Sequence, residues 1–157
     1  MPPDFSSMKI LMTDDDSDDR LLALLAFKKL NVAHSIDFVN NGQELIDYLL
    51  SRLDSKRELP DLILLDLNMP RKDGRQALKE IKAHPKLNQL DTIIFSTSPS
   101  ERDMKDMLEL GARKYIVKPT KSEDLIEIFR LICDELTARP GWHYFIDEQS
   151  SKRTSNG

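Results

Sequence analysis

The 157-residue chain has one cysteine, Cys133, which excludes an internal disulfide framework and any metal site built from several cysteines. No apolar run approaches the roughly 18–20 residues that cross a bilayer. Residues 1–7 (MPPDFSS) lack the basic and apolar regions of an export signal. We therefore expect no membrane partner and a cytoplasmic location, and we read Cys133 as a structural residue.

Positive charge is not in excess either. Lys and Arg total 23 against 27 Asp and Glu, a net charge of -4, which argues against nucleic acid as the main partner. Hydrophobic residues at 39% and charged residues at 32% are typical of a globular protein. We assign residues 9–137 to one domain, 1–8 to an N-terminal extension, and 138–157 to a tail with an aromatic part and then a polar end.

Five short apolar segments alternate with helical patterns along this domain. The predicted strands are Lys9–Thr13, Ser35–Val39, Leu62–Leu65, Thr92–Ser96 and Lys114–Val117. Ser35–Val39 alternates apolar and polar residues, which predicts an edge strand. After the first strand, one helical face is expected to carry Leu22, Leu25, Ala26 and Leu30. Strict alternation predicts an α/β fold, a doubly wound, five-stranded parallel sheet with helices on both faces.

Polar side chains follow four of the predicted strands. Asp14 and Asp15 follow the first strand, Asp66 the third, Thr97 the fourth and Lys118 the fifth. In such a sheet, ligands bind at the carboxyl ends of the strands. Any one of these residues alone could be a cap, a turn residue or a surface charge.

The combination suits Mg²⁺-assisted phosphoryl transfer. The metal would neutralise the clustered carboxylates, the hydroxyl and ammonium would hold phosphoryl oxygens, and one carboxylate would attack. Asp18 and Asp19 are interpreted differently, as the acidic, solvated start of a helix.

Four motifs carry a resemblance to a known family. The segment from Lys9 to about Leu136 resembles the receiver domain of two-component response regulators, through MTDDD, LLLDLNMPRKDG, IIFSTS and GARKYIVKP in the family's order and spacing. The RKDG continuation and the loop before Leu62 are most similar to the small phytochrome-associated, cyanobacterial-type regulators. The resemblance implies a flavodoxin-like (βα)5 fold and a single-domain response regulator of a phosphorelay. Its implied partners are a sensor histidine kinase, of phytochrome type, and either a downstream protein or a phosphotransfer partner.

The resemblance also implies the roles of the acidic residues. Asp66 would be the phosphoacceptor, and Mg²⁺ would be bound directly by Asp15 and through water by Asp14. Asp66 and the backbone carbonyl of Asn68 would complete the protein ligands. No turnover on an outside substrate is expected, because the chain would catalyse only its own phosphorylation and dephosphorylation.

The remaining matched residues would act in the switch. Lys118 would pair with Asp66 and later with its phosphoryl group, and Thr97 would hydrogen-bond that group. Tyr115 would turn inward behind Thr97, changing the surface of the fourth helix, fifth strand and fifth helix. Pro119 would follow Lys118 in a cis peptide.

Three features stay unassigned: Asp16, Pro99 and the aromatic segment Trp142–Ile146. The aromatic segment either folds back on its own domain or contacts a partner, which makes a homodimer one of the interpretations. A monomeric solution mass with a protected tail would argue against the dimer.

Three other functions compete with this interpretation. An aspartyl phosphatase of the haloacid-dehalogenase type needs a second Asp two residues after its nucleophile, where this chain has Asn68. A nucleotide-binding protein is disfavoured because neither G-x-x-x-x-G-K-[ST] nor G-x-G-x-x-G occurs. The alternative left open is a phosphorylation-independent adaptor with a receiver fold, although the complete set of site residues argues against it.

Overall fold

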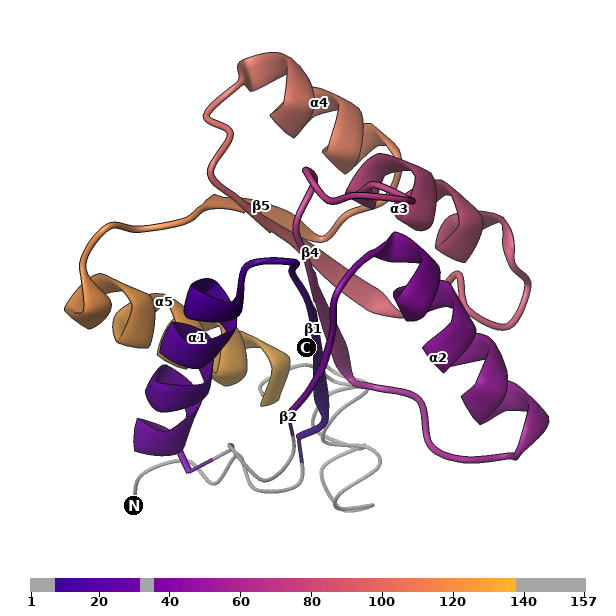
Figure 1. The fold of residues 1–157 in the computed structure, drawn as a ribbon, viewed down its shortest axis with the longest axis horizontal. Helices are drawn as coiled ribbons and strands as arrows, with labels where there is room; N and C mark the ends of the chain where they lie inside the picture. Colours follow the sequence, from indigo (N-terminus) through magenta and orange to yellow (C-terminus); the bar gives the residue numbers. More distant parts are fainter. Residues whose placement is uncertain (1–7, 32–35, 138–157) are drawn as a thin grey trace, which may run out of the picture.

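A computed structural model describes residues 8–31 and 36–137, in which five strands and five helices alternate (Figure 1). The strands are β1 (Ile10–Thr13), β2 (Ile36–Val39), β3 (Leu62–Leu65), β4 (Asp91–Ser96) and β5 (Lys114–Val117). The helices are α1 (Ser17–Lys29), α2 (Gly42–Asp54), α3 (Gly74–Ala83), α4 (Glu101–Glu109) and α5 (Ser122–Thr137). In these two stretches of chain, no helix has the length and hydropathy of a transmembrane segment.

The strands form one parallel sheet in the order β2-β1-β3-β4-β5, which confirms the predicted fold class and the edge position of β2. The chain goes from β1 to β2 on one side and then returns to β3 on the other. The reversal of strand order therefore lies between β1 and β3, where Thr13 is in register with Leu65. Asp14 and Asp66 come directly after this pair, at the position where such sheets bind ligands.

Helices cover both faces of the sheet, α1 and α5 on one and α2, α3 and α4 on the other (Figure 1). An apolar layer lies under each group of helices. The layer under α1 and α5 contains stacked rings of Phe27 and Phe129, with centroids 4.2 Å apart, and Phe95 tilted against them. Met8, just before β1, is fully buried in the same layer. The layer under α2, α3 and α4 is mainly aliphatic. Strands β1 and β3 are buried on both faces, and β4 is buried from Thr92 onwards, which explains their continuous apolar sequences.

The buried face of α1 agrees with the expected one at Ala26 and Leu30, which pack on the core, and differs at Leu22 and Leu25. Leu22 and Leu25 are about half exposed, at 47% and 48%, whereas Ala23, Ala26 and Phe27 are buried. The helix is turned so that Phe27 stacks on Phe129, because an aromatic ring contributes more buried area than a leucine. Leu22 and Leu25 instead line an apolar groove of about 300 Å³ with Leu125 and Ile126 of α5.

This orientation of α1 predicts unequal effects of truncation. Phe27→Ala should lower the free energy of unfolding by about 3–5 kcal/mol, because it opens a cavity under a buried ring. Leu25→Ala should change it by less than about 1 kcal/mol, because the leucine is half exposed. Urea unfolding of both variants measures the difference; equal losses would contradict the observed orientation.

Candidate functional site

Backbone hydrogen bonds place three of the predicted site residues at one edge of the sheet. The Asp14 N–H donates to the Val39 carbonyl at 3.1 Å, and the Asp66 N–H donates to the Thr13 carbonyl at 3.1 Å. The Lys118 N–H donates to the Ser96 carbonyl at 2.8 Å. The strand pairing thus continues one residue beyond β1, β3 and β5, so the backbone under all three side chains is fixed.

The side chains of these residues meet at the Lys118 ammonium. Its Nζ lies 2.6 Å from Asp14 Oδ2 and 3.2 Å from Asp66 Oδ2, and all three side chains are at least 90% buried. Asp19, in the first turn of α1, is a third partner, with its Oδ2 2.7 Å from Nζ. The sequence interpretation missed Asp19, since nothing in the run DDDSDD distinguishes it from Asp18.

The pKa directions reflect this convergence. Burial raises the pKa of Asp14, and the hydrogen bond from Lys118 opposes the rise. For Lys118, burial alone would lower the pKa, but hydrogen bonds to Asp14 and Asp19 and the nearby carboxylate charges outweigh burial and raise it. The surrounding carboxylates therefore favour the charged ammonium form of Lys118 inside the site.

Three carboxylates of the site are close enough to share a cation. One oxygen from each of Asp14, Asp15 and Asp66 lies within 4.8 Å of the others, with Asp14 and Asp66 buried and Asp15 exposed. Asn68 is exposed, and its N–H donates to Asp66 Oδ1 at 3.4 Å. Hard oxygen donors with two negative charges held out of water fit a divalent cation such as Mg²⁺.

Asp16 now has a structural role. Its carboxylate accepts from the N–H groups of Asp18 and Asp19 and so caps α1, while its own N–H donates to Asp14 Oδ1 at 3.0 Å. Arg20, further along α1, donates from Nη1 to the Asp14 carbonyl at 2.7 Å. The start of α1 is therefore fixed directly against the site, which aims Asp19 at Lys118.

Thr97 and Pro119 follow β4 and β5, and only the expected cis bond before Pro119 differs from the structure. Thr97, just after β4, is exposed, and no hydrogen bond in the described part of the chain ties it to Asp66 or Lys118. Within the described residues all peptide bonds are trans, including the one before Pro119, so the cis prediction is wrong. Trans is the lower-energy form by about 0.5–1 kcal/mol, and Lys118 reaches the carboxylates with it.

Tyr115 is connected to the loop that follows Thr97. Its hydroxyl donates to the Ser98 carbonyl at 2.7 Å, and the Ser98 hydroxyl donates to Asp103 Oδ2 at 2.8 Å. Arg75 of α3 donates to the other oxygen of Asp103 at 2.7 Å, and these hydrogen bonds lower the pKa of Asp103. A continuous set of polar contacts thus joins β5, the β4–α4 loop, α4 and α3. Pro99 is exposed in the same loop.

Other predicted features lie away from the site. Burial raises the pKa of the Cys133 thiol to about 12, which suits a structural residue. His84 accepts a hydrogen bond from the Lys86 N–H. The segment Trp142–Ile146 is outside the described residues.

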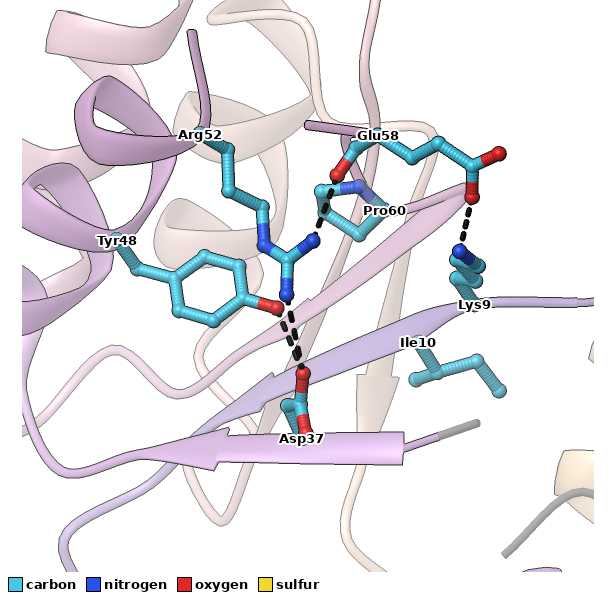
Figure 2. A pocket seen from close by; sticks show the side chains of 7 residues that line it. All are labelled: Lys9, Ile10, Asp37, Tyr48, Arg52, Glu58 and Pro60. Atoms are coloured by element: carbon cyan, nitrogen blue, oxygen red, sulfur yellow. Dashed lines mark hydrogen bonds and ion pairs between the residues drawn. The ribbon is translucent and has the colours of Figure 1, made fainter. Parts of the chain in front are cut away.

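A cavity of about 330 Å³ lies at the opposite, amino end of β1 (Figure 2). Tyr48 donates to Asp37 Oδ2 at 2.7 Å, Arg52 lies over the Tyr48 ring, and Lys9 pairs with Glu58. The charged side chains that line the cavity are paired with one another. These pairs join Lys9, just before β1, to Glu58 in the loop after α2, and Asp37 of β2 to Arg52 of α2.

This cavity predicts a high titration midpoint for Tyr48. Burial and then the hydrogen bond to Asp37 raise the pKa of Tyr48 from 10.0 to about 12. The folded state favours the neutral phenol, so its contribution to stability is complete below the ordinary pKa and is lost as the pH rises toward 12. The difference in phenolate absorbance between wild type and Tyr48→Phe measures this midpoint, and a value near 10 would contradict the observed contacts.

Gly74 predicts a second effect, since it is pressed against the phosphoacceptor candidate. A Cβ at Gly74 would lie 2.2 Å from the Asp66 carbonyl oxygen, so Gly74→Ala must shift the Asp66 backbone. We expect loss of stability together with at least about tenfold weaker divalent-metal binding. Gly111→Ala is the matched control, because its φ of 110° makes alanine strained while its surroundings are the Lys82 side chain. It should lower the melting temperature and leave metal affinity unchanged; equal metal effects would contradict the prediction.

Comparisons with known proteins agree with this geometry. A sequence profile of the response regulator receiver domain matches residues 10–130. The probable methanogenesis regulatory protein FilR2 of Methanothrix harundinacea is 31% identical over 116 residues, which are 74% of this chain and 75% of that protein. Response regulator Rcp1 of Synechocystis is 32% identical over 124 residues, or 78% and 82%.

Solved structures give the same result. The phosphorylated cyanobacterial phytochrome response regulator RcpA superposes with a TM-score of 0.75 and 34% identity, covering 83% of this chain and 94% of RcpA. The Mn²⁺-bound form of Rcp1 gives 0.69 and 31%, covering 80% and 91%. With the profile, the relatives and the fold in agreement, the chain belongs to the response regulator receiver family, whose general function is phosphorylation-dependent signalling with histidine kinases.

Proposed function

We propose that this protein is a phosphorylation switch whose acceptor is Asp66, with Mg²⁺ bound by Asp14, Asp15, Asp66 and the Asn68 carbonyl. The observation that supports it most directly is the meeting of Asp14, Asp66 and Lys118 in one buried cluster beside an exposed Asp15. This arrangement holds the Asp66 carboxylate largely out of water, next to an ammonium and a divalent-metal site that would both bind the oxygens of an incoming phosphoryl group. The solved Mn²⁺ form of Rcp1 supports a divalent metal in this family.

In the proposed reaction an Asp66 oxygen attacks the phosphorus of a kinase phosphohistidine. The phosphorus–nitrogen bond breaks, a phosphorus–oxygen bond forms, and the freed imidazole nitrogen takes a proton from water. Mg²⁺ supplies charge neutralisation for the entering phosphoryl oxygens. Lys118 then hydrogen-bonds one of these oxygens from its place 3.2 Å from Asp66. The exposed Thr97 turns its hydroxyl toward the new group.

The output surface would be formed by α4, β5 and α5. Each of these elements exposes one large apolar side chain: Leu108, Val117 and Leu131. Tyr115 connects β5 to Ser98, the residue after Thr97, through its hydroxyl. Movement of Thr97 toward a phosphoryl group would therefore change this contact and alter the surface that a downstream protein binds.

We also propose a class of kinase that acts on this protein. The likeness to RcpA and Rcp1 supports a phytochrome-type kinase as the donor. Homodimerisation, the downstream protein and the cytoplasmic location stay predictions from the sequence, and a solution mass measurement decides the first of them.

The second candidate is the phosphorylation-independent adaptor. The buried arrangement of Asp14, Asp66 and Lys118 opposes it, because a pure adaptor has no need of buried charges. An aspartyl phosphatase is disfavoured because Asn68 cannot serve as acid or base.

The proposal predicts a covalent modification. Incubation with Mg²⁺ and acetyl phosphate should add the mass of one phosphoryl group to the wild type, and the gain should vanish without Mg²⁺. Asp66→Asn should show no gain, because the amide is not a nucleophile. Intact-mass spectrometry makes the measurement.

The same experiment separates the two candidates. Asp16→Asn is the control, since it changes an equal charge at the cap of α1 and should still be modified. No modification of the wild type by acetyl phosphate or by an active histidine kinase would leave the adaptor as the function.

A further inference from the structure

Asp19 contacts Lys118 but is neither a proposed metal ligand nor the proposed acceptor. Asp19 Oδ2 lies 2.7 Å from Lys118 Nζ, which is closer than Asp66 Oδ2 at 3.2 Å. Asp19 is not in the group of carboxylates that could share a cation in the described residues. Its side chain is 30% exposed, whereas those of Asp14 and Asp66 are at least 90% buried.

Lys118 is bound to two of the carboxylates, Asp14 and Asp66, that a metal would share. Asp14 Oδ1 accepts a backbone N–H from Asp16, and Asp66 Oδ1 is the oxygen facing the Asn68 N–H. The Oδ2 atoms of both residues face the ammonium. A divalent cation bound to these carboxylates would lie within a few ångströms of Nζ and repel it strongly. Metal binding therefore requires Lys118 to give up part of its contact with Asp14 and Asp66.

We propose that Asp19 is a positioning residue that holds the Lys118 ammonium aside when the metal binds, and that this strengthens metal binding. Once the metal shares Asp14 and Asp66, Asp19 is the carboxylate that remains for the ammonium. The start of α1 fixes it for this task, because the Asp16 cap and Arg20 tie that helix to Asp14. The inference rests on the metal site of the proposed function.

The neighbouring Asp18 offers a matched control. It lies in the same first turn of α1 and carries the same charge, but it is exposed and is not a partner of Lys118. Asp18→Asn and Asp19→Asn thus remove equal charge from adjacent positions. A simple loss of negative charge near the site would make their effects similar, whereas a specific contact with Lys118 would not.

The test is a cycle of variants that combines Asp19→Asn with Lys118→Met. Mn²⁺ binding is followed by the loss of the free-ion EPR signal, and circular dichroism confirms that each variant is folded. Asp19→Asn should weaken Mn²⁺ binding about threefold to tenfold, and Asp18→Asn less than about twofold. Lys118→Met should strengthen binding, because it removes the competing cation.

The decisive arm is the double variant. In the Lys118→Met background, Asp19→Asn should change Mn²⁺ affinity no more than Asp18→Asn does, because there is no ammonium left to hold. An undiminished Asp19→Asn effect there, or equal effects of the two single Asn variants, would overturn the inference while leaving the metal site intact. A wild type that binds no Mn²⁺ would overturn both the inference and the metal site of the proposed function.

Discussion

Three carboxylates converge on the ammonium of Lys118, and two of them, Asp14 and Asp66, are almost fully buried. Removing a charge from water costs several kcal/mol, and two neighbouring carboxylates would add their mutual repulsion. The ammonium compensates for both. The rest of the site is arranged around this compensation, because the backbone of Asp14, Asp66 and Lys118 is fixed by hydrogen bonds to the adjacent strands.

The order of the strands explains why the counter-ion of these carboxylates is a lysine. Asp14 and Asp66 follow β1 and β3, which are direct neighbours, but Lys118 follows β5, with β4 between β5 and β3. Strands lie about 4.8 Å apart, so the lysine side chain must extend from β5 across β4 and meet the side chains of Asp66 and Asp14 between the strands. Its ammonium lies 5.9 Å from the centre of the Phe95 ring of β4. The acidic residues come from the centre of the sheet and their counter-ion comes from its edge.

The sequence predicted the strands within one residue and missed details of the helices, for physical reasons. Strands buried on both faces leave continuous apolar runs, as in β3. In α1 the run LLALLAF is apolar nearly all round, so no single face stands out, and the contact between Phe27 and Phe129 decides the orientation. Asp19 was missed because its function depends on where the cap at Asp16 starts the helix. The prediction of a cis bond before Pro119 came from the resemblance alone. With the trans bond, Lys118 still reaches Asp14 and Asp66.

Ser98 links the site around Asp66 to α4 and β5. It follows Thr97 directly, its carbonyl accepts from Tyr115, and its hydroxyl donates to Asp103. A rotation of the Thr97 backbone toward the site would turn the Ser98 peptide as well. The hydrogen bond from Tyr115 to the Ser98 carbonyl and the one from the Ser98 hydroxyl to Asp103 could then not both keep their geometry. Asp103 would then depend on Arg75 alone. Phosphorylation of Asp66 would therefore reach α4 and β5 through one loop residue, without any need for the sheet itself to deform.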